Sequence, residues 1–149
     1  MKILNKQNIS IIGGAGHVGF PLGLAFAEKN FKVDLVDIDL KNIELINSGK
    51  PPFMEIGAEK LLKKNLKKNK IFTKQKLDNL IYSKYIIVCI GTPIDKNLKP
   101  KLTDFINFFK ELKKLIHKDH VIIVRSSIYP GIINKLEKLL EPKNKNIIY

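Results

Sequence analysis

Short apolar runs alternate along the chain with longer stretches in which apolar residues recur at every third or fourth position. The short runs are nearly continuous in isoleucine and valine, which predicts strands buried on both faces of a parallel sheet. The longer stretches predict amphipathic helices. The expected strands span residues 9–12, 32–37, 71–73, 85–90, 120–125 and 146–149. The expected helices span residues 17–29, 40–48, 58–69, 77–83, 104–117 and 131–140, the fifth capped by Thr103 and Asp104.

This alternation predicts the fold class. Right-handed crossovers between successive strands give an α/β fold, a doubly wound parallel sheet with helices on both faces (three-layer α/β/α, the Rossmann arrangement). No linker divides the chain, so we expect one domain over residues 1–149. Ligands of such sheets bind at the carboxyl ends of the strands. Those ends carry residues 14–19, Asp37, 91–93 and 126–127, which we expect to converge on one crevice.

Residues 9–19 read ISIIGGAGHVG, an apolar run that breaks into a GxGxxG sequence before the first expected helix. This context is typical of dinucleotide-binding sites. We expect Gly14 to turn the chain, Gly16 to admit a pyrophosphate and Gly19 to let the helix lie close to the sheet. His17 and Val18 lie between these glycines, where the N–H groups of a helix start bind phosphate.

Asp37 ends the second expected strand. A carboxylate there accepts hydrogen bonds from both hydroxyls of an adenosine ribose and repels a 2′-phosphate, so the sequence favours NAD over NADP as cofactor. Asp39 lies two residues beyond Asp37 and could help to bind the ribose. Asp34 is the competing acid, and its place inside the strand predicts a solvent-facing side chain.

The formal net charge of +13 is a reason to consider a polyanion as a partner. Arg125 is, however, the only arginine, and nucleic-acid-binding proteins depend on arginine for bidentate contacts. The lysine-rich stretch 60–70 has leucines at helical spacing, so we interpret it as the solvated face of a helix. We expect no nucleic-acid partner, although a basic nucleic-acid binder stays open as an alternative.

Cys89 is the single cysteine, so the chain forms no intramolecular disulfide. It lies in an apolar run and is expected to be a packed strand residue. No apolar run reaches the ~18 residues of a membrane span, and glycines interrupt the first run, which argues against a signal peptide. We therefore expect a cytoplasmic protein with no membrane partner.

Five segments resemble the NAD-binding domain of the UDP-glucose/GDP-mannose dehydrogenase family, with a leaning toward its UDP-N-acetylmannosamine dehydrogenases. They are GAGHVGFPLGLAFA at 14–27, VDID at 36–39, INSGKPPFMEIG at 46–57, VCIGTPID at 88–95 and IIVRSSIYPG at 122–131. The last three are more specific than GxGxxG, because other dehydrogenases lack them. The resemblance extends over essentially the whole chain.

The resemblance implies an oxidoreductase that oxidises the C6 alcohol of a UDP-sugar to a carboxylate with two NAD molecules, for surface polysaccharide synthesis. In the family a cysteine nucleophile holds the intermediate, and NAD accepts the hydrides. The full-length protein is then a homo-oligomer. Cys89 does not match that nucleophile. The nucleophile and the sugar-binding domain belong to later segments of the family, so we expect this chain to bind NAD without catalysis and to expose an apolar surface.

The resemblance also implies roles for single residues. Asp37 would bind the ribose, and Val18 would lie at the cofactor phosphates. Ser127, which replaces a threonine, would contact the cofactor and assist catalysis by orienting a water molecule. Asn42 replaces a basic residue, and Arg125 replaces a lysine. The positions that the resemblance adds to the cofactor site are Lys41, Asn42, Gly91, Thr92, Pro93 and Ser127.

Other readings of the chain stay open. His117, Asp119 and His120 are near one another in sequence, but no further ligand accompanies them, so we expect no metal. One alternative function is a non-catalytic dinucleotide-binding module. Another is a Rossmann dehydrogenase of the 3-hydroxyacyl-CoA or 6-phosphogluconate type.

Overall fold

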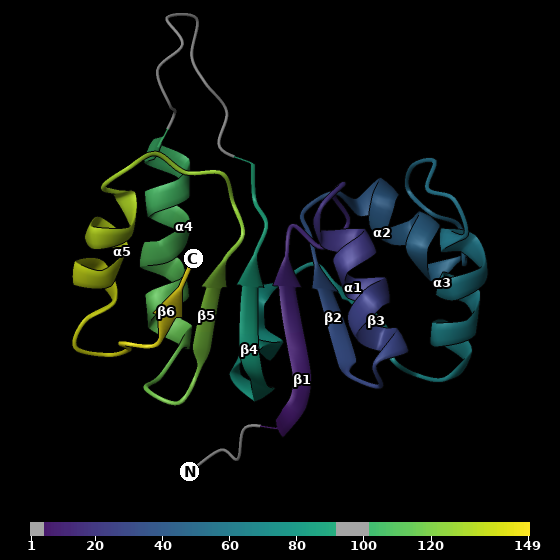
Figure 1. The fold of residues 1–149 in the computed structure, drawn as a ribbon, viewed down its shortest axis with the longest axis horizontal. Coiled ribbons are helices and arrows are strands. Elements are labelled where there is room, and N and C mark those ends of the chain that lie inside the picture. Colours follow the sequence, from purple (N-terminus) through teal and green to yellow (C-terminus); the bar gives the residue numbers. More distant parts are fainter. Residues whose placement is uncertain (1–4, 92–101) are drawn as a thin grey trace, which may run out of the picture.

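A computed structural model describes residues 5–91 and 102–149. Its six strands form one parallel sheet in the order β3-β2-β1-β4-β5-β6 (Figure 1). The strands are β1 Asn5–Ile12, β2 Lys32–Val36, β3 Ile71–Lys74, β4 Ser83–Val88, β5 Val121–Val124 and β6 Ile147–Ile148. The helices are α1 Gly19–Glu28, α2 Leu40–Asn47, α3 Ala58–Lys67, α4 Leu102–Leu115 and α5 Ile132–Leu140, and a 3-10 helix, η1, spans Leu77–Tyr82. The doubly wound parallel sheet is confirmed.

Two hydrophobic cores lie on opposite faces of the sheet, because successive strand residues point to opposite sides. Ile11 and Leu35 pack with Phe20 of α1 on one face. Val88 packs with Phe109 of α4 on the other. The chain adds strands from β1 outward to β3 and then returns to place β4 on the other side of β1, so the strand order reverses between β1 and β4. That reversal is where ligands of open α/β sheets bind.

Several predicted bounds differ from the structure: β1 begins at Asn5 and not at residue 9, and β4 spans Ser83–Val88 and not 85–90. Helix α4 begins at Leu102, so Thr103 and Asp104 lie in its first turn and do not cap it. The segment predicted as a helix over 77–83 is a 3-10 helix that ends at Tyr82. Ser83 belongs to β4, where its hydroxyl lies 2.7 Å from the hydroxyl of Ser10 on β1.

The lysine-rich stretch forms α3, as the leucine spacing predicts. Leu62 is fully buried against the α1 core, and the lysines face outward. Lys64 forms a salt bridge of 2.6 Å with Glu28 of α1. The stretch is therefore the charged outer face of a packed helix.

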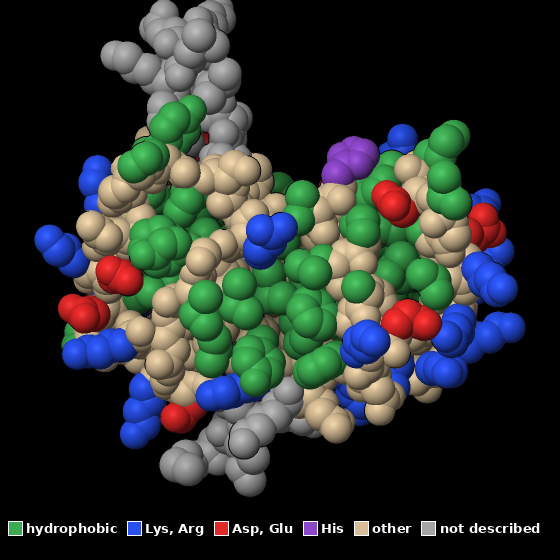
Figure 2. Space-filling model, viewed as in Figure 1, with side chains coloured by type: hydrophobic (Ala, Val, Ile, Leu, Met, Phe, Trp, Pro, Cys, Tyr) green, Lys and Arg blue, Asp and Glu red, His purple; other side chains and the backbone are tan. Residues whose placement is uncertain are grey.

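One face of β4, β5 and β6 is left open by the helices. Figure 2 shows hydrophobic side chains gathered there. Tyr85 and Ile123 are partly buried against the α1 core, and Ile148 is 53% exposed. The structure thus has an apolar surface on this open face of the sheet.

Candidate functional site

The glycine segment joins β1 to α1 at the carboxyl edge of the sheet. Gly13 has φ +75°, in the left-handed region that favours glycine, and it makes the turn that the sequence assigned to Gly14. Gly14 is needed for another reason, because a Cβ there would lie 2.7 Å from the Cα of Leu35 on β2. The N–H groups of Gly13 and Gly14 both donate to the Val36 carbonyl, at 2.9 and 3.1 Å. The loop is therefore pinned against β2.

Gly19 packs against the glycine loop and not against the sheet. A Cβ at Gly19 would lie 2.2 Å from the Gly13 carbonyl oxygen, which no side chain can occupy. The close contact between helix and sheet belongs to Gly23, where a Cβ would lie 2.5 Å from Cδ2 of Leu35. Val18 is the N-cap residue of α1 and contributes no side-chain cap. The first turn of α1 thus begins directly behind the loop.

The carboxylate of Asp37 connects the end of β2 to the glycine loop. Its Oδ2 accepts a hydrogen bond of 2.9 Å from the N–H of Ala15, and its Oδ1 accepts one of 3.1 Å from the N–H of Asp39. Each carboxylate oxygen has a second lone pair, so both can still accept a hydroxyl. Asp39 is occupied elsewhere, because its side chain accepts from the N–H of Asn42 and caps α2.

A cavity of about 390 Å³ brings together three of the predicted segments. It is lined by Gly16, Asp37 and Gly91, together with Cys89. An adjoining apolar recess of about 230 Å³ shares Asp37 and contains Ile90, Phe108 and Gln75. The glycine loop, Asp37 and the end of β4 therefore surround one space, as the sequence predicts.

Ser127 does not share that space. Ser126 and Ser127 line a separate cavity of about 510 Å³ at the end of β5. Among the described residues, three of the four predicted segments thus line one cavity, and the fourth lines a neighbouring cavity at the same edge of the sheet. The reason is that β5 is the neighbour of β4 and not of β1, so its carboxyl end lies one strand farther from the glycine loop.

The remaining predicted residues lie around the rim. Lys41 and Asn42 lie in the first turn of α2 and line neither of the two recesses at Asp37. Thr92 and Pro93 fall outside the described residues. His17 is exposed, and its ring lies 4.0 Å from the ring of Phe53, measured between centroids. This stacking places the 46–57 segment beside the phosphate loop.

Cys89 and Asp34 are both half-buried. Cys89 directly follows β4, its N–H donates to the Ile12 carbonyl at 2.8 Å, and burial raises the pKa of its thiol. Asp34 was expected to face solvent, but burial raises the pKa of its carboxyl. It lies on the sheet face opposite α1, beside Phe72 and Tyr82, and takes no part in the site at Asp37.

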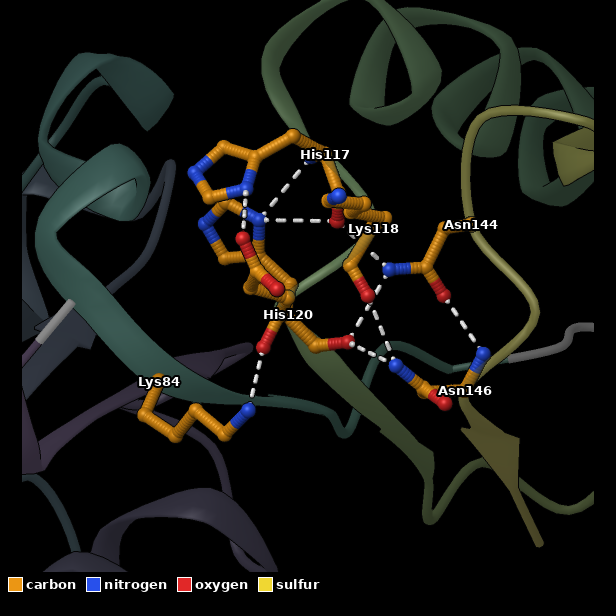
Figure 3. A network of polar contacts seen from close by, with 7 residues as sticks. Lys84, His117, Lys118, His120, Asn144 and Asn146 are labelled. Carbon is orange, nitrogen blue, oxygen red and sulfur yellow. Dashed lines mark hydrogen bonds and ion pairs between the residues drawn. The ribbon is translucent and has the colours of Figure 1, made fainter. Parts of the chain in front are cut away.

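The histidines near β5 form a structural network at the opposite edge of the sheet (Figure 3). The Nδ1 atom of buried His120 accepts from the N–H of His117 at 2.9 Å. Asn144 donates to the carbonyls of His117 and His120, at 2.7 and 2.9 Å. Burial, and then the neighbouring His117, lower the pKa of His120. Within residues 5–91 and 102–149, no three His, Cys, Asp or Glu side chains are grouped to hold a metal ion.

Sequence reasoning missed several lining residues. Gln75, Ile90 and Phe108 line the apolar recess, and none of them was predicted as a site residue. No sequence motif identifies Gln75 as a site residue. It lies in the segment that follows β3, and only the folded structure brings that segment to the recess. Gly13 was recognisable, since it directly follows the β1 apolar run.

The fold and the site define a class of protein: a dinucleotide-binding domain, with a glycine loop, an acid at the end of β2 and an apolar recess where the strand order of the parallel sheet reverses. The family model described as the UDP-glucose/GDP-mannose dehydrogenase family, NAD binding domain, matches residues 7–148. The chain belongs to this family, and it is the NAD-binding domain. This match excludes the alternative that the chain is a Rossmann dehydrogenase of the 3-hydroxyacyl-CoA or 6-phosphogluconate type.

Three relatives illustrate the likeness. An uncharacterized protein of Methanocaldococcus jannaschii is 34% identical over 144 residues, 95% of this chain and 16% of the relative. The UDP-N-acetyl-D-mannosamine dehydrogenase of Pyrococcus horikoshii is 28% identical over 128 residues, 86% of this chain and 30% of the relative. A crystal structure of a GDP-mannose dehydrogenase ternary complex from Pseudomonas aeruginosa has a TM-score of 0.83 and 28% identity, over 93% of this chain and 34% of that one.

The chain therefore spans between 16% and 34% of the length of these proteins. The part that corresponds is the cofactor domain. In the described part of the chain, no helix is long and apolar enough to cross a membrane.

Proposed function

We propose that the domain holds NAD along the carboxyl edge of the sheet, with the adenosine ribose on Asp37 and the pyrophosphate at the loop around Gly16. One observation carries this proposal: Asp37 and Gly16 line a single cavity, so the ribose acceptor and the phosphate loop serve one ligand. A Cβ at Gly16 would meet only the Gly13 carbonyl, at 3.3 Å, so its absence leaves room on the cavity side. Val18, His17 and the start of α1 would flank the phosphates.

The apolar recess beside Asp37 suits the adenine ring. Ile90 and Phe108 offer apolar surface, and the Gln75 amide can donate to and accept from the ring nitrogens. The nicotinamide would then lie toward Cys89 and Gly91 on the other side of the loop. Lys41, Asn42, Thr92 and Pro93 stay proposed contacts, supported by the family resemblance alone.

For the whole protein we propose oxidation of the C6 alcohol of a nucleotide sugar. One alcohol, one water and two NAD⁺ give one carboxylate, two NADH and three protons. Relatives named as dehydrogenases of UDP-N-acetyl-D-mannosamine and of GDP-mannose support this class of substrate. We propose a UDP-sugar, because the sequence motifs lean toward that type. Ser127 assists, homo-oligomers form, and the protein works in the cytoplasm, where a lone cysteine is usual.

The proposal is tested by mapping NAD on the folded domain. Amide signals of ¹⁵N-labelled protein are followed while NAD is added. The proposal predicts the strongest shifts at Gly13, Gly16, Asp37 and Gly91, and weaker ones at Phe108. Shifts confined to α3, or none at concentrations of several millimolar, would refute the assigned site.

A further inference from the structure

A further cavity lies on the sheet face opposite α1, over β2 and β3. Its volume is about 350 Å³, which is within the usual range for small-molecule sites. It shares no lining residue with the two recesses at Asp37 or with the cavity at the end of β5. A ligand in it would therefore be bound together with the dinucleotide and not in its place. The lining residues are Asn8, Lys32, Asp34, Phe72, Lys74 and Tyr82.

Asp34 brings a carboxylate to this cavity from the middle of β2. Its neighbours Val33 and Leu35 are buried in the α1 core, so its own side chain points to the other face of the sheet. Burial raises the pKa of the Asp34 carboxyl, and Lys74 lowers it to a lesser extent. Within residues 5–91 and 102–149, no cation forms a salt bridge with this carboxylate. Its two oxygens can therefore accept hydrogen bonds from a ligand.

Two aromatic side chains reach the cavity from different elements. Phe72 is the register partner of Asp34 on the neighbouring strand β3, and it is 37% exposed. Tyr82 ends η1 and is 49% exposed. Exposed aromatic rings in a cavity bind planar heterocycles by stacking, as they do with nucleic-acid bases.

Two lysines lie on either side of Asp34 along the strand direction. Lys32 precedes it by two positions on the same face of β2, and Lys74 is the register partner of Val36, two positions beyond it. In the described part of the chain, neither ammonium group forms a salt bridge with a carboxylate. Lysine binds phosphate as a point charge. The cavity thus combines one carboxylate, two aromatic rings and two cations.

We propose that this cavity binds guanosine monophosphate (GMP). The base stacks on Phe72 and Tyr82, and the phosphate pairs with Lys32 and Lys74. The two oxygens of Asp34 accept from the N1–H and 2-amino groups of guanine, because guanine is the common base with two adjacent N–H donors on its pairing edge. Bound on this face, the nucleotide lies away from the cofactor cavity and is not a reactant of the proposed oxidation.

The experiment uses ¹⁵N-labelled domain, saturated with NAD so that the cofactor site is filled. It is titrated with GMP, with inosine monophosphate (IMP), which lacks the 2-amino group, and with guanosine, which lacks the phosphate. GMP is predicted to shift the amides of residues 32–34 and 72–74, and the two other probes should bind at least about tenfold more weakly. GMP shifts confined to the glycine loop, equal affinity for GMP and IMP, or no shifts by GMP would each overturn the proposal.

Variants assign the contacts to single side chains. Asp34→Asn keeps the size of the side chain and should remove the preference for GMP over IMP, because an amide group replaces one acceptor oxygen. Lys74→Gln should weaken GMP binding several-fold and leave guanosine binding unchanged. Lys135→Gln removes an exposed cation on α5, outside the cavity, and should leave both titrations unchanged.

A folded Asp34→Asn variant that still prefers GMP over IMP would show that the proposal is wrong. The NAD step separates the two claims. Failure to bind NAD refutes the proposed function, whereas NAD binding without a GMP response refutes only this inference.

Discussion

The carboxylate of Asp37 accepts a hydrogen bond of 2.9 Å from the N–H of Ala15, although 22 positions separate the two residues. Its other oxygen accepts from the N–H of Asp39. The acid that is proposed to read the ribose is therefore also the group that fixes the phosphate loop against β2. The Asp37 side chain would thus serve both ribose binding and the ordering of the glycine loop.

Substitutions at Asp37 separate these two roles through stability. Asp37→Ala leaves two backbone donors without their partner and should lower the free energy of unfolding by about 1–3 kcal/mol. Asp37→Asn keeps one oxygen as an acceptor and should lose roughly half as much. Urea denaturation measures both values. An alanine variant as stable as the unmodified protein would show that the loop does not need the carboxylate.

The glycines of the loop differ in what they tolerate. Gly19→Ala would put a methyl 2.2 Å from the Gly13 carbonyl, so the backbone must move, and we expect a loss of about 3 kcal/mol or more. Gly16→Ala meets the same oxygen at 3.3 Å, so the fold should survive with a small loss. Its NAD affinity should nevertheless fall at least about tenfold, because the methyl occupies the space of the pyrophosphate. Thermal unfolding measures the stability of both variants, and titration measures their NAD affinity. A Gly16→Ala variant less stable than Gly19→Ala would contradict the prediction.

His120 makes stability depend on pH. Burial lowers its pKa in the folded state, whereas an unfolded histidine takes up its proton near pH 6.5. As the pH falls through about 6.5, the unfolded state gains a proton that the folded state lacks, so stability decreases by up to about 1.4 kcal/mol per pH unit. The contribution of His120 to this decrease ends at the lower pH at which His120 is protonated in the folded state too.

His120→Gln should remove that slope between pH 7 and 5.5 in urea denaturation, whatever its effect on absolute stability. His17→Gln is the control, because it removes an exposed histidine of another part of the chain and should keep the slope. A slope that persists in His120→Gln would assign the effect to other groups.

Cys89 reports on the cofactor cavity. Burial raises the pKa of its thiol, so maleimide should label the folded protein slowly at neutral pH and faster as the pH rises. Because Cys89 lines the same cavity as Gly16 and Asp37, saturating NAD should slow the labelling at least about tenfold. Mass spectrometry gives an unambiguous rate, since the chain has one cysteine. Labelling in urea is the control, and a rate that NAD does not change in the folded state would contradict this placement of the cofactor.

The sequence predicted the order and type of the elements because the strands are continuous apolar runs and the helices have clear periodicity. It placed the glycine loop directly after β1 and Asp37 directly after β2, as the structure has them, since both are local features at the end of a strand. It assigned the turn to Gly14 in place of Gly13, because a GxGxxG pattern does not reveal which glycine has positive φ.

Local sequence patterns do not predict the features that depend on strand order. Ser127 lies in a cavity of its own because β5 is separated from β1 by β4. Gln75 and Phe108 reach one recess from segments 33 positions apart in the chain, which no short motif records. The half-buried state of Asp34 likewise depends on Phe72 and Tyr82, which the fold brings beside it.

The most direct test of the central claim is a calorimetric titration of the domain with NAD and with NADP, repeated on Asp37→Ala. The account predicts NAD binding in the micromolar to millimolar range, at least about tenfold weaker binding of NADP, and a loss of that preference in the variant. Equal affinity for the two nucleotides in the unmodified protein, or an unchanged preference in a folded Asp37→Ala variant, would contradict the assignment of Asp37 as the ribose-binding acid.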